Sequence, residues 1–345
     1  MADEFITLKS GKVNDYLHHI DTKAMGTSRM LSIFLGEFDE GSILLDCGSS
    51  LETNKCLRYF KKNDIPLSSF QYLITSHHHF DHNGGIWKLY QELKKYNPHI
   101  KILTNIMTQE LLNNFHHHLS RGSRTYGDFV GTMKPIEESA FQIIDPTTNF
   151  GANPDYIKDI TPFHSNGTEI QLAIYKTPGH TPDHQCPAFV RDGELDFIHY
   201  GEAVGTIYHS SKLVTMPTSM PIYYNHEKYM NSLINIKKLT PSKAGFGHFG
   251  MIHGEENIRG LVSEHENFMI QFRENIVKYY EEQPETKHVL KKIMPTMTRR
   301  TDLSMNVTPV FESMILAIVY GEMISLGYRD IPDDERALFE KYYAL

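Results

Sequence analysis

The stretch of this 345-residue chain that decides its fold reads Ser76-His77-His78-His79-Phe80-Asp81-His82-Asn83-Gly84-Gly85. Four of its side chains can bind metal and follow an H-x-H-x-D-H spacing: His77, His79, Asp81 and His82. The stretch comes directly after an apolar run, residues 70–75, which predicts a buried β-strand. A carboxylate among histidines is typical of a catalytic metal site. The alternative is a histidine-rich surface loop or a tag, but a tag would lie at a terminus and would lack the Asp-His-Asn-Gly-Gly ending.

Three further potential ligands each follow a predicted strand. They are His180 in Thr-Pro-Gly-His-Thr, Glu202 in Tyr-Gly-Glu-Ala-Val-Gly and His248 in Gly-Phe-Gly-His-Phe-Gly. A hydrolytic site with two metals needs about three protein ligands for each cation and a free position for solvent. The first stretch provides four ligands, so the others must come from later strand ends. His253 competes with His248, and the glycines on both sides of His248 favour the latter.

The elements around the first stretch alternate between strand and helix. Apolar residues recur with helical spacing over 51–62 and 84–96, and 100–104 is the next predicted strand. This succession is typical of a layered α/β protein. Helical patterns dominate after His253. We therefore predict an α/β catalytic domain over residues 1–254 and a helical region over 255–345.

Composition restricts the class of protein. The chain has 34 basic and 42 acidic residues, and this acidic balance argues against a nucleic-acid partner. We find neither a secretory signal nor an apolar run of about 18 residues, so we expect no membrane span. The three cysteines are widely spaced and odd in number, which argues against a disulfide framework. A cytoplasmic protein acting on a small molecule is the expectation.

The H-x-H-x-D-H motif, followed in order by Gly-His-Thr-Pro, Gly-Glu and Gly-His-Phe-Gly, resembles the metallo-β-lactamase fold superfamily. The similarity is greatest to its glyoxalase II-like and lactonase-like hydrolases, and it covers roughly residues 13–254. It implies an α/β, four-layer βαβα sandwich that carries its metals at one edge of two sheets. The helical C-terminal extension would then serve as a substrate cap or as a homodimer interface.

The resemblance also implies a ligand set. The first metal would be held by His77, His79 and His180. The second would be held by Asp81, His82 and His248. Glu202 stands where the family usually has a bridging aspartate; being one methylene longer, it could bridge the metals, bind one of them or change their spacing. The implied cofactors are two divalent ions, with zinc favoured and iron or manganese possible.

Other histidines and polar residues receive weaker predictions. We expect His184 and Tyr223 to contact substrate, although packing is an alternative for both. The triplet at 116–118 predicts a solvated helix face or a wall of the substrate site. We expect His78 to support the site or lie at the surface, and His199 to pack in the core or support the site. Asp46 ends a strand as the family's core aspartate does, which implies that it holds turn amides near the metals without binding them.

The implied function is that of a metal-dependent hydrolase for an ester, thioester or lactone. A metal-bridging hydroxide would attack the carbonyl, and Asp81 would bind metal and orient that hydroxide. A di-iron protein that reduces oxygen or nitric oxide is an alternative, but such relatives typically have glutamate at the position of His79. A phosphodiesterase or nuclease with the same metals, and an effector-binding protein, are further alternatives.

Overall fold

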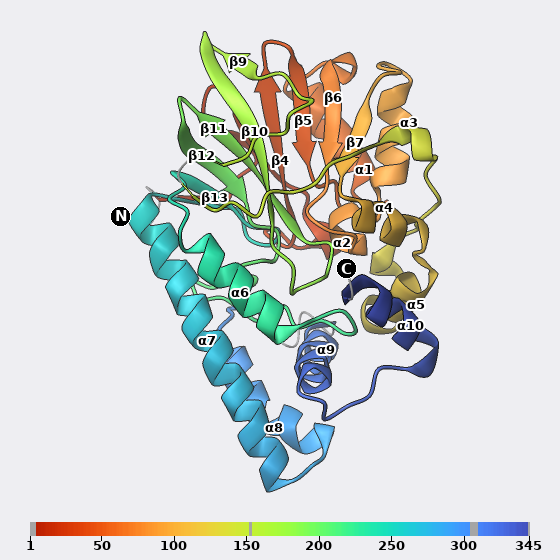
Figure 1. The fold of residues 1–345 in the computed structure, drawn as a ribbon, viewed down its shortest axis with the longest axis vertical. Coiled ribbons are helices and arrows are strands. Elements are labelled where there is room, and N and C mark those ends of the chain that lie inside the picture. The colour runs from red at the N-terminus through yellow and green to blue at the C-terminus, as the bar shows by residue number, and fades with distance from the viewer. Residues whose placement is uncertain (1–4, 152–153, 304–309, 344–345) are drawn as a thin grey trace.

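Two mixed β-sheets of seven strands each form the centre of the fold and lie face to face (Figure 1). The computed structural model describes residues 5–151, 154–303 and 310–343. Within these ranges, no helix combines the length and apolar character needed to cross a membrane. All three cysteines are buried free thiols.

The N-terminal sheet is built from strands in the first half of the chain. In spatial order they are β2 (Gly11–Lys12), β3 (Leu17–Asp21), β4 (Ser32–Phe38), β5 (Gly41–Leu45), β6 (Phe70–Ile74), β7 (Lys101–Thr104) and β8 (Phe141–Ile143). Strands β5 to β8 pair in parallel, and helices connect them because parallel neighbours need a crossover. These crossovers place the ends of β5, β6 and β7 at one edge of the sheet.

The C-terminal sheet contains one early strand and six late ones. In spatial order they are β1 (Ile6–Thr7), β14 (Met251–His253), β13 (Lys243–Gly245), β12 (Glu194–His199), β11 (Gln185–Arg191), β10 (Thr168–Lys176) and β9 (Phe163–Ser165). Its neighbours are antiparallel except β12 and β13, which the helix α6 (His226–Ile236) connects. The aromatic rings of Phe34 and Phe197 meet between the two sheets, with centroids 5.1 Å apart.

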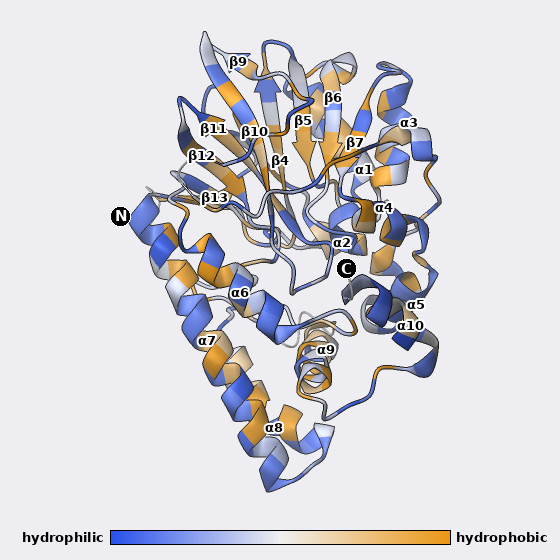
Figure 2. Ribbon diagram, viewed as in Figure 1, coloured by the Kyte–Doolittle hydropathy of each residue, from blue (hydrophilic) through white to orange (hydrophobic). Residues whose placement is uncertain are grey.

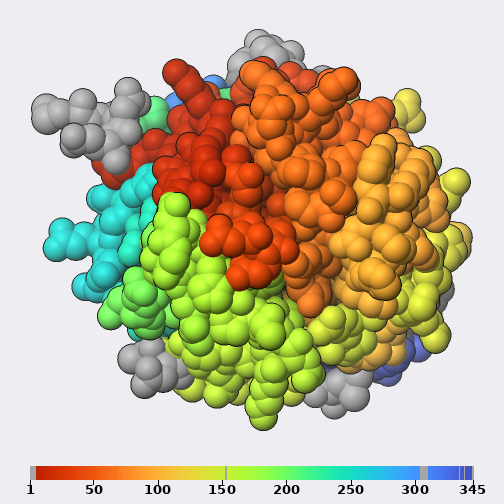
Figure 3. Space-filling view, turned by 90° about the horizontal axis from the view of Figure 1, so that it is seen from above, coloured from red at the N-terminus to blue at the C-terminus, as the bar shows by residue number. Residues whose placement is uncertain are grey.

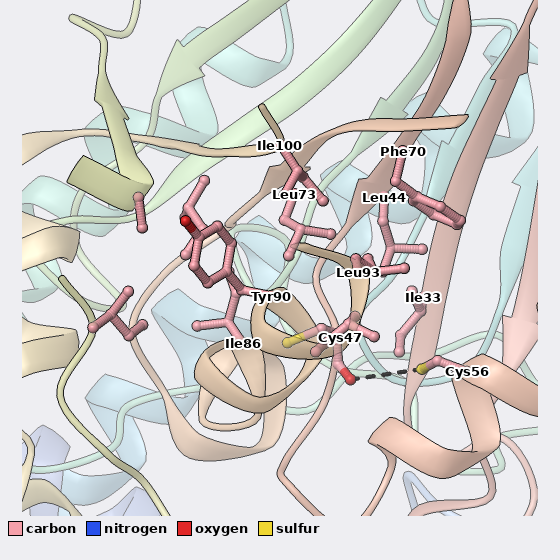
Figure 4. Close-up of a cluster of buried hydrophobic side chains, with 14 of the residues drawn as sticks. Ile33, Leu44, Cys47, Cys56, Phe70, Leu73, Ile86, Tyr90, Leu93 and Ile100 are labelled. Carbon is pink, nitrogen blue, oxygen red and sulfur yellow. Dashed lines mark hydrogen bonds between the residues drawn. The ribbon is translucent and has the colours of Figure 1, made fainter. Parts of the chain in front are cut away.

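Helices cover both outer faces of this sandwich. On the N-terminal sheet, α1 (Thr53–Lys62) and α3 (Ile86–Lys94) enclose an apolar core that includes Leu44, Leu73 and Leu93 (Figure 4). In the same core, the Cys56 thiol donates to the Cys47 carbonyl at 3.8 Å. On the other sheet, α6 and the long helix α7 (Glu255–Glu282) form the fourth layer. Both helices carry hydrophobic and hydrophilic residues, as helices with one buried face do (Figure 2). The predicted four-layer α/β sandwich is confirmed.

The helical C-terminal region is also confirmed. It continues from α7 into α8 (Thr286–Thr298), α9 (Val310–Ser325) and α10 (Asp333–Tyr343). Helices α8, α9 and α10 lie at one end of the sandwich, whereas segments from the first part and the middle of the chain form the opposite end (Figures 1 and 3). An apolar cluster joins Leu31 and Tyr208 of the sandwich to α7, α8 and α9. The predicted division into two domains at residue 254 stays a prediction.

Several short elements complete the fold, and one of them, α5 (His116–Tyr126), is the helix expected to carry the histidine triplet at 116–118. Helices α2 (Phe80–Asn83), α4 (Ile106–Asn113) and α5 lie near the metal-ligand motif or in the irregular segment after β7. Short 3-10 helices cover Ala24–Gly26, Leu67–Ser69, Gly127–Val130 and Glu138–Ala140. The sequence patterns did not predict α8, which contains Pro295, because an internal proline interrupts the helical signal.

Candidate metal centre

Loops at one edge of the two sheets bring the predicted ligands together. After β6 ends, the chain passes through His77 and His79 into α2, which carries Asp81 and His82. The loop between β10 and β11 adds His180. Glu202 follows β12, and His248 lies in the tight connection between β13 and β14. The sequence positions span more than 170 residues, and only the packing of the two sheets makes them neighbours.

The first group of ligand atoms surrounds one carboxylate oxygen. Glu202 Oε2 lies 2.6 Å from His180 Nε2, 3.4 Å from His77 Nε2 and 3.8 Å from His79 Nδ1. His180 Nε2 and His79 Nδ1 are themselves 3.0 Å apart. The four ligand atoms all lie within 4.8 Å of one another and could hold a metal ion.

The second group lies beside the first. His248 Nε2 is 3.5 Å from Asp81 Oδ2, and His82 Nε2 is 3.9 Å from the same oxygen. These three ligand atoms also fall within 4.8 Å of one another. Glu202 connects the groups, because its Oε1 lies 3.8 Å from His248 Nε2 while its Oε2 faces the first group. The longer side chain therefore reaches both sets of ligands.

Hydrogen bonds at the outer nitrogens orient four of the histidine rings. His180 Nδ1 donates to the Thr218 carbonyl at 2.6 Å, and His248 Nδ1 donates to the Met30 carbonyl at 2.5 Å. His82 Nδ1 pairs with Asp46 at 3.0 Å, and His77 Nδ1 with Ser76 at 3.0 Å. A proton held at each Nδ1 leaves the lone pair of Nε2 facing inward, which is how metal-binding histidines are commonly fixed.

Asp46 is the centre of this supporting network. Its carboxylate accepts from the Ser76 backbone and hydroxyl, each at 2.7 Å, and from His82 and His199 at 3.0 and 2.9 Å. Asn83 Nδ2 adds a further bond of 2.7 Å. The predicted role in holding turn amides is thus accompanied by a direct role in orienting His82. His199 is a buried partner of Asp46, as expected.

The charges around the site suit a cation. Burial alone would raise the pKa of Asp46, but hydrogen bonds from His199 and His82 hold that pKa below its ordinary value. Burial lowers the pKa of His77 well below its ordinary value, which keeps it in the neutral, metal-binding form. Burial opposes protonation of His82, yet Asp81 and Asp46 raise its pKa to about 9, so a cation bound there would displace the Nε2 proton of this ring. The carboxylates of the site therefore attract positive charge.

Unsatisfied nitrogen atoms provide an independent test of fit. Nε2 of His77 and Nε2 of His82 are buried without a hydrogen-bond partner. A buried polar atom without a partner costs free energy, about 1–3 kcal/mol, unless another ligand satisfies it. Both atoms belong to the proposed ligand set and point towards its carboxylates. The residues present therefore fit bound metal.

A hollow leads from this centre towards the C-terminal helices. Its lining includes Asp81, Glu202 and His79, together with Arg121 of α5 and Ala317 of α9. A second hollow reaches His248 and Asp81. Three residues line both hollows: Asp81, Tyr126 and Tyr208. Sequence reasoning missed both tyrosines, because neither belongs to a motif.

The two predicted substrate contacts lie elsewhere. His184 is 1% exposed and stacks on His77, with centroids 5.0 Å apart. Its Nε2 accepts from the Glu202 backbone N–H at 3.1 Å, so it positions the Glu202 loop from behind. Tyr223 packs against His78, at 5.7 Å between centroids, and is absent from the linings described for both hollows. The geometry supports packing, the alternative considered for both residues.

The other histidines divide between support and surface. His78 is buried, and its Nδ1 and backbone N–H both bind the carboxylate of Asp183, a buried residue that sequence reasoning missed. His118 lines the first hollow, whereas its neighbours at 116 and 117 are exposed. The triplet thus contributes one residue to the predicted wall. His253 bonds to Thr7 at 2.7 Å, away from the centre.

Comparison with known proteins identifies the family. The model of the metallo-beta-lactamase superfamily matches residues 31–248, which is more than half of the chain. The chain belongs to this superfamily. Members of the superfamily are typically metal-dependent hydrolases. The match includes every proposed ligand and ends before α7, so the C-terminal helices lie outside it.

Solved structures of superfamily members share the fold at low sequence identity. A superfamily protein from the archaeon Sulfolobus tokodaii is 18% identical with a TM-score of 0.58, over 89% of this chain and 98% of that one. A B3 metallo-beta-lactamase described as having an active-site glutamic acid is 12% identical with a TM-score of 0.52, and the match covers 78% of this chain and 92% of that one. A subclass B3 metallo-beta-lactamase from a soil metagenome library is 17% identical with a TM-score of 0.50, and the match covers 76% of this chain and 94% of that one. The search of curated proteins found no match.

Proposed function

We propose that this protein is a two-metal hydrolase that cleaves an ester, thioester or lactone. The observation that carries the proposal is the position of Glu202, whose two oxygens face the two groups of ligands at the end of a hollow. His77, His79 and His180 would hold one cation. Asp81, His82 and His248 would hold the other. Two divalent cations, when bound, lower the pKa of water and polarise a carbonyl group.

The glutamate differs from the aspartate usual at this position in the family. One of the structural relatives is itself described as carrying an active-site glutamic acid. In this chain His184 accepts a hydrogen bond from the backbone N–H of Glu202. Burial lowers the pKa of His184 to about 3, so His184 remains a neutral acceptor near pH 7. A fixed backbone allows the longer side chain to span both ligand groups.

The two tyrosines that line both hollows supply hydrogen-bond donors beside the ligands. Burial raises the pKa of Tyr126 and that of Tyr208 well above the ordinary value, so both phenols keep their protons near pH 7. Tyr208 packs on His248, with centroids 5.1 Å apart. A neutral phenol at this place can donate to the oxygen of a carbonyl on which negative charge develops.

The test combines metal analysis with a substrate panel. Purified protein should contain close to two divalent ions per chain and hydrolyse members of a panel of thioesters, esters and lactones, but not phosphodiesters. His79→Ala should lower metal content and reduce turnover at least a hundredfold, while His99→Gln, at an exposed site, should change neither. Unchanged metal and turnover in His79→Ala would contradict the ligand assignment. Oxygen or nitric oxide consumption without hydrolysis would instead establish the redox function.

Glu202→Asp tests whether the extra methylene of glutamate is needed at this position. Because aspartate is the usual family residue, this variant should retain both metals and activity. Loss of one metal equivalent would mean that Glu202 needs its extra methylene to reach both groups. Self-association through the C-terminal helices is a separate proposal, and light scattering of the full chain tests it.

A further inference from the structure

Hydrogen bonds hold the backbone of Glu202 from both sides. Its N–H donates to Nε2 of His184 at 3.1 Å. Its carbonyl accepts from the hydroxyls of Thr218 and Tyr229, each at 3.2 Å, and both of these side chains are buried. The carboxylate of Glu202 faces both groups of proposed ligands. Whatever fixes this backbone therefore also fixes the direction in which the carboxylate points.

The hydroxyl of Tyr229 stands behind two proposed ligands. Tyr229 belongs to α6, and its oxygen lies 3.5 Å from the Thr218 hydroxyl as well as 3.2 Å from the Glu202 carbonyl. The Thr218 carbonyl accepts the Nδ1–H of His180 at 2.6 Å. His180 Nε2 in turn lies 2.6 Å from the Glu202 carboxylate. One phenol thus contacts the supports of two side chains in the first group.

A histidine of α7 completes the hydrogen bonds of this hydroxyl. His265 is fully buried, with Nε2 2.7 Å from the Tyr229 oxygen and Nδ1 2.7 Å from the Thr215 hydroxyl. Because the phenol accepts the Gly205 N–H at 2.8 Å and gives its one proton to the Glu202 carbonyl, Nε2 of His265 has to donate to it. Burial lowers the pKa of His265 to about 3, so the ring is neutral and its Nδ1 accepts from Thr215. Each of these groups then has a partner.

The packing of Gly205 shows independently that His265 restrains the loop after Glu202. Gly205 has a positive φ of 66°, a conformation that glycine adopts without strain. A Cβ atom at this position would lie 2.4 Å from Cε1 of His265 and 2.6 Å from the Met216 carbonyl oxygen. The imidazole ring therefore packs directly on the loop backbone. The superfamily match ends at residue 248, so this ring comes from the part of the chain that follows the match.

We propose that Tyr229 and His265 are positioning residues for the first metal ion. Together they fix the backbone of Glu202 and, through Thr218, the ring of His180. This inference rests on the proposed function, because it requires Glu202 and His180 to bind metal. It gives the C-terminal region a role at the metal centre, since α7 supplies the donor on which the phenol depends. Removing the hydrogen-bond partners that orient metal ligands typically weakens metal binding by about 10–100-fold.

Zinc binding to the full-length protein tests the proposal without any substrate. Metal-free protein is titrated with Zn²⁺ against a chromophoric chelator, which gives the Kd of each bound ion. Tyr229→Phe removes only the hydroxyl and should raise the Kd of at least one zinc ion about 10–100-fold. It should also change the visible absorption of the Co²⁺-loaded protein, because the ligands around the metal are displaced. A hydroxyl that only stabilises the fold would lower the melting temperature and leave both the Kd values and the cobalt spectrum unchanged.

Variants of His265 and a matched tyrosine localise the effect. His265→Leu should weaken zinc binding as Tyr229→Phe does, whereas His265→Gln keeps an amide N–H donor and should retain the wild-type Kd. Tyr16→Phe is the control, because it also removes a buried tyrosine hydroxyl with a partner, Asp196, but in the core between the sheets. Unchanged Kd values in folded Tyr229→Phe and His265→Leu would overturn this inference and leave the proposed function intact. A wild-type protein that binds no zinc would overturn the ligand assignment as well.

Discussion

At the scale of single residues, the side chains proposed to bind metal differ from the side chains that orient them by hydrogen bonds. Asp46 illustrates the second kind. It adopts a positive φ of 60°, which aspartate tolerates better than most residues, and thereby turns its carboxylate towards two loops. From there it orients His82 directly and His77 through the hydroxyl of Ser76. One buried carboxylate thus fixes ligands of both groups.

A buried histidine also supports the site, at a greater distance from the proposed ligands. His265 of α7 is fully buried, and its Nε2 lies 2.7 Å from the Tyr229 hydroxyl. Tyr229 in turn accepts from the Gly205 N–H at 2.8 Å and lies 3.2 Å from the Glu202 carbonyl. The helical region is therefore connected by hydrogen bonds to the loop that carries Glu202.

We predict that His265 makes stability depend on pH. Burial and the nearby Arg300 lower the pKa of His265 to about 3, whereas an unfolded histidine has a pKa of about 6.5. The contribution is complete above about pH 6.5 and is lost as the pH falls towards 3, because only the unfolded chain binds a proton there. His265→Gln should reduce the stability difference between pH 7 and pH 5 by about 2 kcal/mol.

Urea unfolding of the two proteins at both pH values measures this effect. His99→Gln serves as the control, because His99 is exposed. Equal pH dependence in wild type and His265→Gln would show that His265 is not neutral in the folded protein.

At the scale of elements, α9 depends on one close approach. A Cβ atom placed on Gly321 would lie 1.9 Å from the Ser219 carbonyl oxygen, in the segment that also supplies Met220 to the first hollow. Ser219 in turn donates its hydroxyl to the Ile318 carbonyl at 2.8 Å. The absence of a side chain at 321 thus lets α9 lie directly over the site.

Gly321→Ala should therefore displace α9 and destabilise the protein by about 1–3 kcal/mol. Denaturant unfolding measures the loss. Gly260→Ala is the matched control: Gly260 lies on the exposed side of α7 with open space around its Cβ position. Because alanine favours a helix more than glycine does, this variant should gain about 0.5–1 kcal/mol. Equal stabilities for the two variants would contradict the close approach.

At the scale of the whole molecule, the sandwich has apolar cores on both outer faces and between its sheets. These cores do not depend on the ligand residues. Removing the metals with a chelator should therefore leave the far-ultraviolet circular dichroism unchanged. It should also lower the melting temperature, by roughly 5–10 °C if the metals are present at about 100 times their Kd.

Adding zinc back should restore the melting temperature and the activity together. Loss of all secondary structure on chelation would show that the metals are chiefly structural.

The sequence by itself determined the layered α/β class and was enough to propose the ligand motif and the later ligands in their order. These features depend on short-range spacing, such as His77 to His82 within six residues, and on apolar runs that form strands. Tertiary structure decided the rest. Three features depend on contacts between distant segments: the reach of Glu202 across both groups, the support from Asp183 and His184, and the position of Tyr126 and Tyr208 beside the proposed ligands. Side-chain packing, rather than local spacing, determines such contacts, so a lone aspartate or tyrosine in the sequence does not reveal them.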